Sequence, residues 1–203
     1  LLPVQANNHP IYNPSLDYSV YLSQPFFFVL FQVLILLTTV YTVGIEIKFR
    51  TATDWLATAK GNMITAVLGK LLPYTFIYIL IGWLGNYVMF GILHIPFQGS
   101  WWLINMITVL FVIATQALGL FIFSLFPAVS LVISVVSMVG SLGATLSGVT
   151  FPVSNMYPLV RDVSYLFPVR HFTEMIQTML YGGGGFIYLW PSMVILCIFP
   201  LLA

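Results

Sequence analysis

The sequence predicts an all-α integral membrane protein, built as a polytopic helical bundle. Hydrophobic residues make up 60% of the 203 residues, and charged residues make up only 5%. A typical soluble domain carries about 25% charged residues, so these few charges cannot cover a water-soluble surface. The apolar stretches are continuous and do not alternate with polar residues, which favours spanning helices over a membrane β-barrel.

Four stretches are long enough to cross a bilayer, and a fifth is incomplete. A spanning helix needs about 20 mostly apolar residues. The expected spans are residues 25–45, 71–93, 101–125, 128–149 and 186–203. The sequence starts without Met and stops inside the fifth stretch. We therefore interpret it as an internal piece of a longer protein.

The basic residues orient the bundle in the membrane. Four of them lie between the first two spans and two lie on the opposite side: Lys48, Arg50, Lys60 and Lys70 against Arg161 and Arg170. Cytoplasmic loops carry the excess of Lys and Arg. We therefore expect residues 46–70 in the cytoplasm, and the 94–100 loop and the 150–185 segment outside.

The 46–70 segment contains a predicted short helix over about residues 52–60. Thr51 to Asp54 has the pattern of a capping box, with Asp in place of the usual Glu. Lys60 fits the last turn, and Gly61 fits the position just past it. Such a helix is either an interfacial anchor that only fixes the topology or a docking element.

Residues 150–185 are too apolar for a solvated loop, and prolines divide them. Two short helices are expected, over about 158–166 and 169–181, ending at Gly182 to Gly185. Neither can cross a bilayer, so we expect a pair of re-entrant helices in the outer leaflet. The charged residues of the segment are Arg161, Asp162, Arg170 and Glu174. They either sit at the headgroup level or take part in a gate, and Arg170 and Glu174 are spaced to pair.

Several classes of function are disfavoured. A net charge of +1 gives no basic patch for nucleic acid. The single cysteine, Cys197, excludes an internal disulfide framework and a cysteine metal site. The span middles carry no Asp, Glu, Lys or Arg, which argues against a proton-coupled pump, a charged ion filter or an intramembrane enzyme. No nucleotide-binding motif occurs, so any ATP must be bound by another polypeptide or domain.

Polar but uncharged residues are scattered through the spans. We expect most of them to hydrogen-bond between helices; they are Gln32, Thr38, Thr39, Asn86, Asn105, Thr108, Thr115 and Gln116. The fourth span also carries a stripe of small residues: Ser134, Ser137, Ser141, Ala144 and Gly148. Such a stripe lets a second helix approach closely. That helix belongs either to the same subunit or to a second copy across a dimer seam.

Three short runs, 46–51, 54–58 and 69–73, resemble the cytoplasmic loop of ABC-2 type permeases, the membrane subunits of bacterial ABC exporters. Ser147-Gly-Val-Thr-Phe-Pro152 and Phe167-Pro-Val-Arg-His-Phe172 resemble the segment before its last span. Tyr12-Asn-Pro14 resembles the end of the large extracytoplasmic domain in the multidrug-type branch. The resemblance covers nearly the whole chain in order.

The resemblance implies about five spans in these residues and six in the full subunit. Residues 1–24 would close the extracytoplasmic domain, and residues 25–203 would form the permease domain. The full protein would be a multi-pass protein of the bacterial inner membrane, surrounded by membrane lipid. It would pair with a second permease copy or a paralogue and with a separate ABC ATPase. The permease would bind no cofactor itself and would not be an enzyme, because the ATPase subunit uses the ATP.

The resemblance also implies roles for individual residues. The coupling helix that contacts the ATPase would use Glu46, Lys48, Arg50, Thr51, Asp54, Trp55 and Leu56. An outer gate would use Phe151, Pro152, Arg161, Asp162, Pro168, Arg170 and Glu174. A patch of Trp and Arg with a polar rim also has the composition of a protein-binding hot spot.

The expected function is therefore the substrate-pathway subunit of an ATP-driven exporter. The alternative is a non-transporting membrane scaffold or assembly subunit, which would have the docking loop but no substrate path. A secondary transporter is disfavoured by the uncharged spans and by the lack of a visible inverted repeat.

Overall fold

The structure is a computed structural model that describes residues 18–126, 128–181 and 186–202. Within those ranges the chain is helical and contains no strand, which confirms the all-α fold class. Of the expected end of the extracytoplasmic domain at residues 1–24, residues 1–17 lie outside the described residues, as does the glycine run at 182–185. Residues 18–24 are helical and continue into the first span.

Four described helices are long and apolar enough to cross a membrane. They are α1 (Tyr18–Lys48), α3 (Met63–Asn86) with its π-helical continuation η1 (Tyr87–Ile92), α4 (Trp101–Leu125) and α5 (Val129–Leu146). They overlap the four complete spans expected from the sequence. The 25 residues of α4 extend over about 38 Å at about 1.5 Å per residue, against a hydrocarbon thickness of about 30 Å. The fifth apolar helix is α8 (Phe186–Leu202).

The expected 46–70 loop is mostly helical, which corrects the sequence interpretation. Helix α1 continues to Lys48, and α3 begins at Met63 rather than at Leu71. The Asn62 side chain accepts a hydrogen bond of 3.2 Å from the Thr65 amide and so caps the start of α3. Lys70 consequently lies within the first two turns of α3 rather than in a loop.

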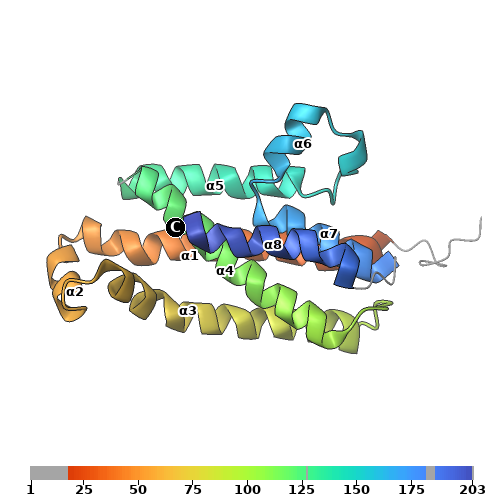
Figure 1. Ribbon diagram of the computed structural model, residues 1–203, viewed down its shortest axis with the longest axis horizontal. Coiled ribbons are helices and arrows are strands. Elements are labelled where there is room, and N and C mark those ends of the chain that lie inside the picture. The colour runs from red at the N-terminus through yellow and green to blue at the C-terminus, as the bar shows by residue number, and fades with distance from the viewer. Residues whose placement is uncertain (1–17, 127, 182–185, 203) are drawn as a thin grey trace, which may run out of the picture.

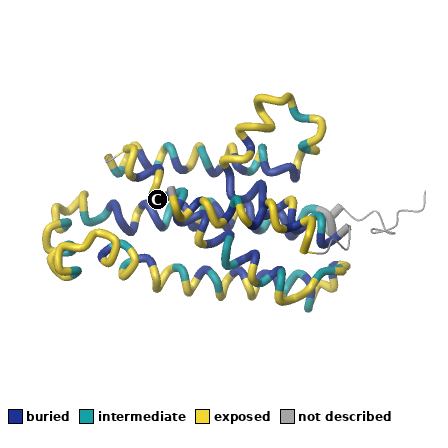
Figure 2. Tube along the Cα trace, in the orientation of Figure 1, coloured by how far each residue is buried: buried dark blue, intermediate teal, exposed yellow. Residues whose placement is uncertain are grey.

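Helix α1 is central to the packing of the bundle. It contacts α5, α4, α3 and the short helix α7 (Pro168–Tyr181). Rings from three helices meet in the interior: Phe172 of α7 lies 4.0 Å from Phe28 and 4.8 Å from Phe111, measured between ring centroids. All three side chains are fully buried, and Figure 2 shows the buried residues concentrated along this middle layer. Aromatic packing therefore fills the centre of the described bundle.

Helix α3 is the most exposed of the long helices. Only 17% of its most apolar window is buried, and large apolar side chains such as Leu72, Phe76 and Leu84 are at least 60% exposed. In a membrane, this face is suited to contact with lipid.

The short helices lie at the ends and the edge of the bundle. Helix α2 (Ala52–Thr58) joins α1 to α3 at one end of the long axis, and the turn between η1 and α4 lies at the other end (Figure 1). The one-turn helix η2 (Val153–Asn155) and helix α6 (Pro158–Ser164) follow α5, and α6 lies against it. Helices α6 and α7 fall where two short helices were expected.

Candidate functional site

The N-terminus of α2 is not held by the predicted capping box. Thr51 occupies the cap position with φ −93° and ψ 4°, and its side chain makes no cap hydrogen bond. A capping side chain usually requires extended backbone at this position. The Thr51 hydroxyl instead donates to the carboxylate of Glu46, in the last turn of α1. The hydrogen bond therefore ties α2 back to α1 rather than closing α2 on itself.

The C-terminus of α2 is closed by backbone hydrogen bonds. The helix ends at Thr58, and Lys60 rather than Gly61 occupies the first left-handed position past the cap, with φ +55°. The Lys60 amide donates to the Ala57 carbonyl, and the Gly61 amide donates to the Leu56 carbonyl. This pair of bonds is a Schellman motif with lysine at the position usually taken by glycine. The end of α1 is closed in the same way, with Arg50 at φ +59°.

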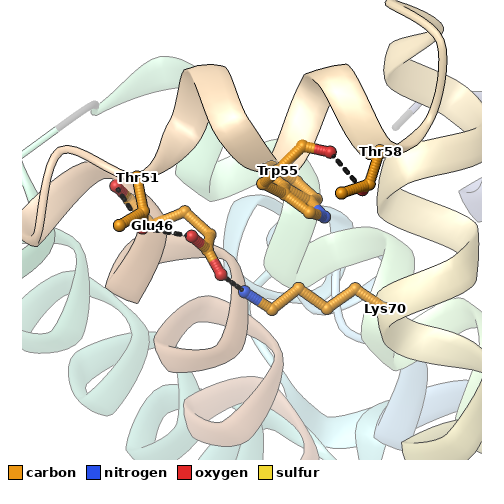
Figure 3. Close-up of polar contacts among 5 residues, drawn as sticks. All are labelled: Glu46, Thr51, Trp55, Thr58 and Lys70. Carbon is orange, nitrogen blue, oxygen red and sulfur yellow. Dashed lines mark hydrogen bonds and ion pairs between the residues drawn. The ribbon is translucent and has the colours of Figure 1, made fainter.

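A polar cluster beneath α2 joins three helices (Figure 3). The Lys70 ammonium of α3 forms an ion pair with the Glu46 carboxylate of α1. The same ammonium lies 5.1 Å from the ring centroid of Trp55 in α2, and the Thr58 hydroxyl donates over 2.6 Å to the Trp55 carbonyl. The Lys70 and Glu46 side chains are only 21% and 19% exposed, so the contacts are partly shielded from solvent. We call Glu46, Thr51, Trp55 and Lys70 the elbow cluster.

Trp55 is half-buried, so it is not the exposed aromatic that the hot-spot interpretation assumed. It packs against an apolar cluster that includes Leu71 and Phe123. Leu56 is also half-buried. Both residues therefore hold α2 on the bundle.

The outward surface of this region is formed by other residues. We call it the elbow surface, and its exposed members are Lys48, Phe49, Arg50, Thr53, Asp54, Ala57 and Thr58. Phe49 directly follows the last residue of α1, and its side chain is 64% exposed. Sequence reasoning missed it. The available signal was an aromatic residue placed between two basic residues just past an apolar span.

The predicted outer-gate residues divide into two groups. Phe151, Pro152, Arg161 and Asp162 are exposed, on the segment around α6. On α7, Pro168 and Arg170 are buried, with Arg170 only 5% exposed, whereas Glu174 is exposed. Arg170 therefore lies inside the bundle, and both the headgroup-level and the gate interpretations stay predictions.

Arg170 belongs to a polar network that reaches the last helix. Its guanidinium lies 3.3 Å from the Glu174 carboxylate, as the spacing predicted. Its guanidinium carbon also lies 5.6 Å from the Tyr165 ring centroid. The Ser192 hydroxyl of α8 donates over 3.0 Å to Glu174. Ser192 was not identified from the sequence, because an isolated serine in an apolar span carries no local signal. The network joins α7 to α8.

A second contact joins the start of α7 to α1. The Val169 amide donates over 2.9 Å to the side-chain oxygen of Gln32, which is fully buried. Gly143 of α5 permits this arrangement, since a Cβ there would lie 2.7 Å from the Gln32 side-chain nitrogen. A side chain at position 143 would therefore displace Gln32 where α1, α5 and α7 meet.

Only part of the predicted small-residue stripe packs within the described bundle. Ser134, Ser137 and Ser141 are exposed, and their hydroxyls donate to carbonyls of the same helix. The opposite face of α5, with Val132 and Val136, is buried. Ala144 is half-buried and Gly148 is buried. The three serines therefore form a free face of the described residues, which we call the serine face.

Most of the uncharged polar residues singled out in the spans hydrogen-bond between helices, as predicted. Thr38 and Thr39 instead donate to carbonyls of their own helix. The Asn86 amide donates to the side chains of Asn105 and Thr108, which joins α3 to α4. The Thr75 hydroxyl donates over 2.7 Å to Gln116. In the described part of the chain, no group of three or more His, Cys, Asp or Glu side chains is placed to hold a metal ion.

Comparison with known proteins identifies the family. Residues 1–203 match the family described as "ABC-2 family transporter protein". The chain is 30% identical over 122 residues to the "Probable multidrug ABC transporter permease YbhS" of Escherichia coli (strain K12), a match that covers 58% of the chain and 32% of the relative. It is 30% identical over 109 residues to the "Inner membrane transport permease YhhJ" of the same strain, covering 52% of the chain and 28% of the relative.

The matched segments are thus about a third of the length of these relatives, at 32% and 28%. No solved structure matches the chain. Because the family match extends over all 203 residues, the chain belongs to the ABC-2 family of transporter proteins.

Proposed function

We propose that this chain is the transmembrane subunit of an ATP-driven ABC exporter of the bacterial inner membrane. A separate ABC ATPase docks on the elbow surface and supplies the ATP chemistry. We call α2 with the turns on either side of it the elbow. The observation that carries the proposal is how the elbow is held on the bundle. The turn before α2 exposes Phe49 and Arg50, and α2 itself exposes Asp54. The elbow cluster fixes α2 to α1 and α3.

We expect the elbow to transmit movement because the elbow cluster joins α2 to both α1 and α3. A partner bound to α2 moves Glu46 of α1 and Lys70 of α3 together. Helix α1 is continuous over 31 residues, and its Gln32 side chain accepts a hydrogen bond from the start of α7. A displacement of the elbow therefore reaches the proposed outer gate through one helix. The ATPase must bind the two arrangements unequally to drive the change.

The proposed pathway lies between two copies of the permease. The centre of the described bundle is filled by the rings of Phe28, Phe111 and Phe172, which leaves little room for a path through one copy. The serine face offers a polar surface that the described residues leave open. One relative is named a probable multidrug permease, and the middles of the spans carry no charged residue. We therefore propose an amphipathic or apolar substrate.

The docking proposal is tested with exposed residues, because Trp55→Ala would also disturb the packing of α2. The double variant Phe49→Ala/Asp54→Ala of the full-length chain is compared with Phe76→Ala, which removes an exposed ring on α3. Loss of interface anchors weakens binding by about 2 kcal/mol or more, or about 30-fold. We expect the double variant to lose co-purification with the ATPase and ATP-dependent transport in vesicles, and Phe76→Ala to keep both.

Unchanged association and transport in a folded double variant would refute the docking assignment. The scaffold alternative gives another result in the same experiment. A scaffold would bind the ATPase through the elbow, yet the reconstituted wild-type complex would move no substrate.

A further inference from the structure

A cavity of about 660 Å³ lies between the elbow and the membrane helices. Its walls come from α1, α2, α3, α4 and the end of α8. They are Val43, Ile47, Ala52, Trp55, Leu56, Met63, Ile64, Val67, Leu68, Leu120, Phe123, Ser124 and Pro200. We call it the inner cavity. Its volume falls in the range of about 300–1,000 Å³ that is usual for ligand sites.

The side chains that line the inner cavity are apolar apart from the Ser124 hydroxyl and the indole nitrogen of Trp55. Four of its large apolar side chains are also exposed at the surface: Ile47 at 43%, Met63 at 55%, Ile64 at 70% and Leu68 at 54%. These residues belong to the last turn of α1 and the first turns of α3, which are the ends of two candidate spans. With the elbow on the cytoplasmic side, as proposed above, this opening faces the acyl region of the inner leaflet, where an apolar group can enter without crossing water.

The charges around the cavity favour an anionic occupant. The ion pair between Glu46 and Lys70 is internally balanced. The remaining charged residues of the elbow are exposed: Lys48, Arg50 and Lys60 are basic, and Asp54 alone is acidic. Lys48 directly follows Ile47 in the cavity wall, and Arg50 lies two residues before Ala52. Basic residues near the cytoplasmic surface attract anionic lipid headgroups.

We propose that the inner cavity binds an acyl chain of one anionic phospholipid from the inner leaflet, with its headgroup beside the basic residues of the elbow. This lipid would pack against Trp55, whose ring also contacts Lys70. It would therefore support the seating of α2 on the bundle. The inference goes beyond the proposed function. It depends on one part of that proposal, namely that the elbow faces the cytoplasm.

The test uses Trp55 as a reporter, because it lines the cavity. The other tryptophans of the sequence, Trp83, Trp101, Trp102 and Trp190, are at least 42% exposed and can be replaced by Phe. The full chain with Trp55 as its sole tryptophan is placed in vesicles that contain phospholipids brominated on the acyl chains. Quenching by brominated phosphatidylglycerol is compared with quenching by brominated phosphatidylcholine at equal mole fraction.

We expect Trp55 to be quenched preferentially by the anionic lipid. Each basic residue near the surface changes this preference by about fivefold. Lys48→Gln should therefore reduce the preference by about fivefold, and the matched variant Asp54→Asn should increase it. Val67→Phe, which fills the cavity, should abolish the selective quenching, while Leu72→Phe on the exposed side of the same helix should preserve it.

Native mass spectrometry of the unaltered full chain provides a second measurement, which does not depend on the tryptophan replacements. We expect one retained phosphatidylglycerol, absent from Val67→Phe and present in Leu72→Phe. Equal quenching by the two lipids would overturn the proposal, because it would indicate an uncharged occupant or bulk lipid. Selective quenching or lipid retention that persists in Val67→Phe would also overturn it. Neither measurement requires ATP or the ATPase, so their failure is distinguishable from failure of the docking proposal.

Discussion

The left-handed backbone at Lys60 is the residue-scale feature with the clearest energetic consequence. A residue with a Cβ costs about 1–2 kcal/mol in this conformation, which glycine relieves at an entropic cost of about 0.5–1 kcal/mol. We predict that Lys60→Gly stabilises the end of α2 by about 0.5–1 kcal/mol. The measurement is hydrogen exchange at the Gly61 amide, which donates to Leu56 and should exchange about two- to fivefold more slowly.

Lys60→Ala is the matched control for that prediction. Alanine removes the same charge but keeps the Cβ, so the exchange rate at Gly61 should not fall. If alanine slows exchange as much as glycine does, backbone strain at Lys60 is not the cause.

The ion pair between Glu46 and Lys70 joins two helices at the residue scale. Both side chains are about one-fifth exposed, at 19% and 21%, so solvent screens the pair only in part. Exposed pairs are worth about 0.2–1 kcal/mol, and we expect a coupling near the upper end of that range. A double-mutant cycle with Glu46→Gln and Lys70→Met, followed by chemical unfolding in detergent, measures it. Strictly additive effects of the two substitutions would show that the pair does not stabilise the elbow.

At the scale of elements, the sequence predicted helices better than their ends. Composition alone located the spans, and Pro158 and Pro168 located α6 and α7. The start of α3 was placed late, because Lys60 and Lys70 made the segment look like a polar loop. Lys70 is tolerated inside a helix because Glu46 of α1 neutralises it. That partner is 24 residues away in sequence and cannot be read from local pattern.

The candidate site shows the same limit. Helical spacing predicted α2, but it did not show that Trp55 faces inward and that Phe49 faces outward. The orientation of Trp55 depends on the apolar cluster with Leu71 and Phe123, which comes from α3 and α4. Likewise, Ser192 acquires a partner only when α8 packs beside α7.

The serine face of α5 provides the element-scale prediction. If a second copy packs there, cysteines introduced on that face lie close enough to their equivalents for disulfide formation, with Cα atoms within about 7 Å. In a Cys197→Ser background, we expect at least one of Ser134→Cys, Ser137→Cys and Ser141→Cys to give a cross-linked dimer. Val136→Cys, on the buried face, should give none.

Leu72→Cys on the exposed face of α3 is a further control in the same membranes. Cross-linking at Leu72 but at none of the three serine positions would place the dimer contact on α3. The serine face would then lose its assigned role.

At the scale of the whole molecule, the account depends on the direction in which the elbow faces. The elbow and the turn between η1 and α4 lie at opposite ends of the bundle (Figure 1). The residues of the elbow surface and His94, which belongs to that turn, are exposed. A docking site for an ATPase must face the cytoplasm, where the excess of basic residues is expected. The same orientation is required for the inner cavity to open toward the inner leaflet.

The most direct measurement is labelling of Thr53→Cys and His94→Cys, each in a Cys197→Ser background, with a thiol reagent that does not permeate membranes. Thr53 is an exposed member of the elbow surface. In intact cells we predict labelling at position 94 and none at position 53. In inside-out vesicles position 53 should react, and bound ATPase should protect it. Labelling of position 53 from outside intact cells, or labelling in vesicles that the ATPase leaves unchanged, would contradict the account.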